Sequence, residues 1–120
     1  MKKILIINNH ADTMSMIERY LERHKFEAEY IYRAQGQEVI EKVKKFKPDL
    51  VLLEGGIGKE GPLCQRIKND GIKVPVIIMA GHISEKETYE DCGADDVIHK
   101  PLEPKLLLEK IDKVLHIHGK

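Results

Sequence analysis

The 120 residues of the chain suffice for one domain with a single buried core. Twenty basic and twenty acidic residues leave no net charge at pH 7, so bulk attraction to nucleic acid or to an anionic membrane is not expected. The two cysteines, Cys64 and Cys92, have no CxxC spacing, and we expect them to be buried thiols in a reducing cytosol. The first apolar run, residues 4–7, is too short for a signal peptide or a membrane span, so we expect a soluble cytoplasmic protein.

Five short apolar runs predict β-strands. Most of them lack polar alternation, which indicates that both of their faces are covered, as in a parallel sheet between helices. The second run alternates loosely, which suits a less protected edge strand, and the pattern does not assign its two faces. In chain order the predicted strands are residues 4–7, 26–34, 50–53, 74–79 and 96–99.

Helical spacing of apolar residues fills the intervals between these strands. Asp12 or Thr13 is expected to cap the first helix, and Pro48 closes the second. Met14 and Met16 are assigned to the core or its edge. A fourth helix is predicted at residues 84–92. The inward-facing residues predicted for the other helices are Met14, Ile17 and Leu21; Val39, Ile40, Val43 and Phe46; Leu63, Cys64 and Ile67; and Leu107, Leu108, Ile111 and Leu115.

The regular alternation of strands and helices determines the fold class. Short connections between consecutive elements require right-handed crossovers and a parallel sheet with helices on both faces. The sequence therefore predicts a three-layer α/β/α sandwich with a five-stranded parallel sheet. Residues 1–120 form one domain, and residues 117–120 are expected to be a frayed tail.

The run at residues 50–53 ends abruptly at Glu54, which is followed by two glycines. In open α/β sheets the functional crevice lies beyond the carboxyl ends of the strands. Glu54 is therefore the first candidate site residue.

Several motifs together resemble the receiver domain of two-component response regulators. They occur in the expected order and span essentially the whole chain. They are Ile4-Leu5-Ile6-Ile7 before a polar pair, Pro48-Asp49-Leu50-Val51-Leu52-Leu53 before a carboxylate, Val74-Pro75-Val76-Ile77-Ile78-Met79, Gly93-Ala94-Asp95-Asp96 and Lys100-Pro101. The resemblance implies a flavodoxin-like fold with sheet order 2-1-3-4-5.

The resemblance also implies a phosphorylation site, at which this chain departs from the family pattern. In the family an acidic pair after the first strand holds Mg²⁺, and an aspartate after the third strand accepts a phosphoryl group. A Thr or Ser after the fourth strand and a Lys after the fifth complete the site. The corresponding residues here are Asn8, Asn9, Glu54, Ala80 and Lys100, so that only the lysine is retained.

These departures predict a degenerate receiver, which is not an enzyme and uses no metal or cofactor. The aromatic switch residue of the family is replaced by Val97, and the loop after Glu54 is about two residues short of the usual length. Glu54 is expected to pair with Lys100, either as a permanent substitute for the phosphoryl group or as a relic pair; the two alternatives stay open.

By the same resemblance, the partner is a protein: an output domain, a kinase or another signalling protein. It would dock on the face formed by the fourth helix, the fifth strand and the fifth helix, without nucleic acid or membrane, and homodimerisation through this region is an open alternative.

Two other functions remain as alternatives. One is a working phosphoacceptor that is weakly phosphorylated on Glu54 or another residue. The other is a metal- or ligand-binding domain that uses His10, His82 and His99, which all fall near the carboxyl edge of the predicted sheet. Because no spacing motif supports such a cluster, these histidines are expected to be solvated loop residues.

Overall fold

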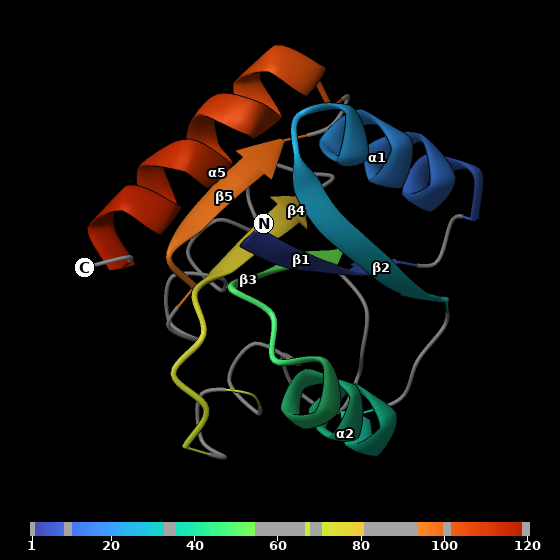
Figure 1. Ribbon diagram of the computed structural model, residues 1–120, viewed down its shortest axis with the longest axis vertical. Coiled ribbons are helices and arrows are strands. Elements are labelled where there is room, and N and C mark those ends of the chain that lie inside the picture. Colours follow the sequence, from blue (N-terminus) through green and yellow to red (C-terminus); the bar gives the residue numbers. More distant parts are fainter. Residues whose placement is uncertain are drawn as a thin grey trace.

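The computed structural model describes residues 2–8, 11–32, 36–54, 67, 71–80, 94–99 and 102–118. Five parallel strands form one sheet in the order β2-β1-β3-β4-β5, which confirms the order that the resemblance implied (Figure 1). The strands are β1 (Lys2–Asn8), β2 (Phe26–Tyr32), β3 (Leu50–Glu54), β4 (Val76–Ala80) and β5 (Asp96–His99).

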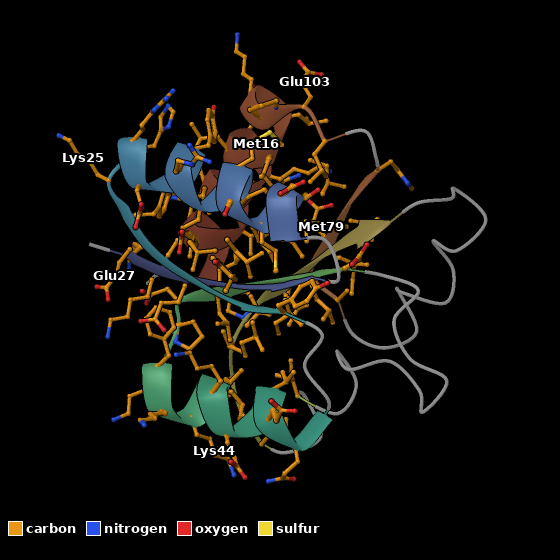
Figure 2. All side chains as sticks on the ribbon, turned by 90° about the vertical axis from the view of Figure 1, so that its right-hand side faces the viewer. Met16, Lys25, Glu27, Lys44, Met79 and Glu103 are labelled. Atoms are coloured by element: carbon orange, nitrogen blue, oxygen red, sulfur yellow. The ribbon has the colours of Figure 1, made fainter. Side chains whose placement is uncertain are left out.

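Helices cover both faces of this sheet. Helices α1 (Ala11–Arg23) and α5 (Pro104–His118) lie on one face, and α2 (Gly36–Phe46) lies on the other (Figures 1 and 2). The predicted third and fourth helices lie outside the described residues except for Ile67, which is helical and fully buried on the α2 side.

The core consists of two apolar clusters, one on each face of the sheet. Successive residues of β1 alternate between them: Ile4 and Ile6 pack with α1 and α5, whereas Leu5 and Ile7 pack with α2. A strand that is buried on both faces has no polar face, and this is why its sequence shows no alternation.

The edge strand β2 has one well-covered end. Phe26 and Ala28 are buried on the α1 side, while Ile31 packs partly on the α2 side. Tyr30 and Tyr32 are 41% and 45% exposed, as expected for a strand with a neighbour on one side only. The structure thus assigns the two faces that the sequence pattern left open.

Three local predictions about the helices need revision. Helix α1 begins at Ala11, so Asp12 and Thr13 lie in its first turn rather than at the capping position. Met16 is 53% exposed and does not belong to the core. In α5 (Pro104–His118), Val114 is buried, whereas Leu108 and Leu115, which were predicted to face inward, are only partly buried.

Two aspartates join neighbouring strands at the edge where the strands begin. The Asp49 backbone N–H donates to Lys3 O (2.7 Å), and its carboxylate accepts from the Lys3 backbone N–H (2.7 Å). Asp95 makes the same pair of bonds with Val76, both at 2.8 Å. Each aspartate therefore extends the hydrogen-bond ladder by one side-chain bond and fixes the strand register where it begins.

None of the helices in the described part of the chain is both long and apolar enough to span a membrane.

Candidate functional site at the carboxyl edge of the sheet

Four neighbouring strands end side by side at one edge of the sheet. Their last residues are Asn8 in β1, Glu54 in β3, Ala80 in β4 and His99 in β5. The register confirms that they lie side by side, because Glu54 pairs with Met79 and Ala80 pairs with His99. Adjacent strands are about 4.8 Å apart, so these strand ends are close neighbours, at the edge where open α/β sheets have their functional crevice. The structure thus brings three of the five predicted site positions together.

Glu54 is the one charged residue that is buried among those the structure describes, with 6% of its surface exposed. It follows four buried apolar residues of β3, which carry the chain to the edge of the sheet. A carboxylate in such a place loses hydration and needs compensating contacts. Glu54 does take part in a polar or electrostatic interaction, which fixes its side chain in this buried position.

The other predicted site residues are placed less completely. Asn8 ends β1, and its side chain is not described. Ala80 ends β4 and has only a methyl side chain, so it offers no hydroxyl at this edge. Asn9 and Lys100 follow β1 and β5 directly in sequence but lie outside the described residues, as do His10 and His82.

Strand β5 carries a feature that the sequence did not reveal. His99 is partly buried in the strand rather than solvated in a loop, and its Nδ1 is buried without a hydrogen-bond partner as far as the structure describes the chain. Val97, two residues earlier, is half-buried against the α2-side cluster. The alternation of side chains along a strand places His99 on that same face, and this spacing was the available signal.

The histidine cluster gains no support from the described residues. No group of three or more His, Cys, Asp or Glu side chains within the ranges given above is arranged to hold a metal ion. His10 and His82, the two other members of the proposed cluster, lie outside those ranges.

Comparison with known proteins identifies the family. Residues 4–112 match the model of the response regulator receiver domain. The chain belongs to the response regulator receiver domain family. It is thus a receiver domain of the kind found in two-component systems, as the sequence motifs implied.

Individual relatives agree with this assignment. The phosphate regulon transcriptional regulatory protein PhoB of Pseudomonas aeruginosa is 32% identical over 98% of this chain and 53% of its own length. A two-component response regulator from Clostridium difficile superimposes with a TM-score of 0.85 at 27% identity, with both chains fully covered. A CheY-like receiver domain protein from Methanospirillum hungatei shares the fold with a TM-score of 0.86 at 24% identity, over 99% of this chain and 97% of its own.

The receiver spans about half the length of the curated relatives that it matches, such as the Bacillus subtilis regulator PhoP, of which 48% is covered.

Proposed function

We propose that this receiver is an atypical one, which acts as a protein-interaction module in two-component or phosphorelay-type signalling without phosphorylation or Mg²⁺. The observation that carries the proposal is the position of Glu54: a buried glutamate ends β3, where the family resemblance implies an aspartate that accepts the phosphoryl group.

The residues at this edge do not fit Mg²⁺ well. Mg²⁺ is a hard cation that is usually bound through carboxylates and phosphate oxygens in a near-ideal octahedron. Asn8 and Asn9 offer neutral amides where the family has an acidic pair. With Glu54 and Lys100 included, the formal charge of the site is about zero instead of about minus two. We therefore expect Mg²⁺ to bind weakly and to play no part in the function.

The acceptor is displaced as well. Phosphoryl transfer depends on in-line positioning and on neutralisation of the charge that develops on the phosphoryl oxygens. The Glu54 side chain is one methylene longer than aspartate, and an error of about 1 Å in a reacting group can cost about a hundredfold in rate. Both the metal and the position of the nucleophile are therefore altered, and Glu54 is expected to remain unphosphorylated.

Glu54 instead acts as a fixed negative charge. It already makes a polar or electrostatic interaction in its buried position, and Lys100 is the cation that the family places nearby. An ion pair between them would hold the edge of the sheet in one conformation, as a phosphoryl group does in a regulated receiver. The alternative is a relic pair, in which the two charges only neutralise each other.

The proposed output is a static docking surface. Ala80 has no hydroxyl to follow a phosphoryl group, and Val97 has no ring to rotate between two positions. The partner is expected to be a kinase, an output domain or another cytoplasmic signalling protein that contacts the face around β5 and α5. Homodimerisation through this face is the open alternative, and neither nucleic acid nor membrane is required.

Intact mass after incubation with acetyl phosphate and Mg²⁺ tests the proposal. The matched control is a variant with Asn8→Asp, Asn9→Asp and Glu54→Asp, which restores the family's carboxylates. The native chain should stay unmodified, whereas the variant should gain one phosphoryl group. A phosphorylated native chain would overturn the proposal. It would favour the second candidate function, a weakly working phosphoacceptor, which is supported by the retained Lys100.

A further inference from the structure

The opposite edge of the sheet, where the strands begin, carries a concentration of exposed cations. Helices α1 and α2 end at this edge, and β1 and β2 start there; Figure 2 shows Lys25 and Glu27 on this side of the molecule. Around the starts of β1 and β2 and the ends of α1 and α2, five exposed basic residues form no ion pair within the described part of the chain; they are Lys2, Arg23, Lys25, Lys45 and Lys47, named here the basic edge.

The cations at this edge outnumber the carboxylates that the described chain places there. Glu22 and Glu27 are exposed, and the Asp49 and Asp95 carboxylates accept hydrogen bonds from the backbone N–H groups of Lys3 and Val76. Lys3 itself is held, because its Nζ lies 3.4 Å from Phe46 O and 5.4 Å from the centre of the Phe46 ring. Since the whole chain has no net charge, this edge is a local positive region on a neutral molecule.

The backbone holds three of the cations close together. Lys2 pairs in register with Phe26, the neighbour of Lys25. The Lys3 carbonyl accepts from the backbone of Asp49, two residues after Lys47. Strands β2, β1 and β3 are adjacent, so Lys25, Lys2 and Lys47 begin or precede neighbouring strands about 4.8 Å apart.

Two of these lysines occupy strained backbone positions. Lys25 and Lys47 follow α1 and α2 with positive φ values of 68° and 54°, a conformation in which glycine is the usual residue. Lysine at the end of a helix gains from the helix dipole, but glycine would remove the steric strain. Strain that persists at an exposed site, where a simple substitution would relieve it, points to a use for the side chain.

We propose that the basic edge is a docking surface for an acidic segment of a protein partner. Carboxylates complement exposed lysines in charge. The basic edge lacks the features that bind phosphate groups, nucleic-acid bases or lipids. Helices α1 and α2 present their C-termini here and so offer no free N–H groups for phosphates. The exposed large apolar residues of the described chain are Met16, Tyr30, Tyr32 and Leu106, none of which belongs to the basic edge, so there is neither a stacking platform for bases nor an anchor for lipid.

This surface does not depend on the proposed function, because Glu54 lies at the other end of the strands. A receiver with this arrangement has two separate places for partners: the proposed face around β5 and α5, and the basic edge where the strands begin. Binding at the basic edge should be unaffected by acetyl phosphate, so failure of this inference can be distinguished from failure of the proposed function.

Fluorescence anisotropy with a labelled oligoglutamate peptide tests the inference on the full chain. Two variants remove charge from the edge: Lys25→Gly with Lys47→Gly, and Lys2→Gln with Lys45→Gln. The matched control, Lys105→Gln with Lys113→Gln, removes two exposed lysines from α5. Each edge variant should bind about tenfold more weakly than the parent, the control should bind like the parent, and added salt should weaken the parent's binding.

Three results would overturn the proposal. The first is absence of binding to the peptide at low salt. The second is an equal loss of affinity in the α5 control, which would indicate general attraction to lysines. The third is equal or tighter binding of a DNA duplex or of phosphatidylserine vesicles, which would assign the edge to a different class of partner. Thermal unfolding of every variant confirms that weaker binding does not reflect an unfolded chain.

Discussion

At the scale of single residues, the Asp49 carboxylate contributes to the stability of the fold. Asp49 accepts a hydrogen bond from the Lys3 backbone N–H at 2.7 Å, and this donor is partly buried. Asp49→Ala leaves the N–H without its acceptor and should lower the free energy of unfolding by about 1–3 kcal/mol. Asp49→Asn keeps an acceptor oxygen and should cost less.

Urea unfolding of both variants checks this prediction. Asp112→Ala is the control, since Asp112 is exposed on α5 and its loss should change stability by no more than about 0.5 kcal/mol. Equal stability of Asp49→Ala and the parent would show that water replaces the carboxylate at no cost.

Glu18 on α1 provides a prediction about pH. Partial burial raises the pKa of its carboxyl above the ordinary value, and the neighbouring Glu22 and Glu29 add to the increase, while Arg19 opposes it. The folded state therefore holds this proton more tightly than the unfolded chain does. The contribution of Glu18 to stability is greatest at acid pH and falls as the pH rises through the raised pKa.

Glu18→Gln removes this titration. Its stability relative to the parent should increase between acid and neutral pH, as measured by urea unfolding across that range. Glu109→Gln on the exposed surface of α5 is the control. A difference between the Glu18 variant and the parent that does not change with pH would contradict the assigned direction of the shift.

At the scale of elements, unbroken apolar runs predicted the strands well, because burial on both faces leaves few other patterns for a parallel strand. β5 matches its predicted range, and β1, β3 and β4 differ from theirs by one or two residues at an end. The last two residues predicted for the second strand, 33–34, lie outside the described residues. Helix starts and the exposed Met16 were less predictable. They depend on where neighbouring elements pack, which local propensity does not encode.

The helix end at Lys25 gives a prediction at this scale. Lys25→Gly removes the steric strain of a side chain at positive φ. After allowance for the greater freedom of glycine in the unfolded chain, the substitution should raise the free energy of unfolding by about 0.5–1 kcal/mol. The matched control is Lys113→Gly inside α5, which should lower it by about 1 kcal/mol. Thermal unfolding of the two variants measures both values; destabilisation by Lys25→Gly would show that the lysine contributes more through its charge than it costs in strain.

At the scale of the whole molecule, the sequence predicted where the site lies better than how its side chains interact. Strand ends identify the edge, so Asn8, Glu54 and Ala80 fall side by side as expected. The burial of Glu54, and the lack of a hydrogen-bond partner for His99 Nδ1 among the described residues, depend on which side chains cover the edge from other elements. Periodicity along one strand contains no information about those neighbours.

The charge at the carboxyl edge of the sheet should also determine how the stability of the whole domain responds to Mg²⁺. A metal that binds only the folded state stabilises it by about 2.7 kcal/mol when present at about a hundred times its dissociation constant. The native site, with two neutral amides and one buried glutamate, should show no such gain, so its Tm should not depend on Mg²⁺. The variant with Asn8→Asp, Asn9→Asp and Glu54→Asp places three carboxylates at one edge; their repulsion should lower its Tm without metal, and Mg²⁺ should restore it. Potassium chloride at matched ionic strength is the control, because it screens charge repulsion without binding as Mg²⁺ does. A Mg²⁺-dependent Tm of the native chain would show that amide ligands suffice to hold the ion.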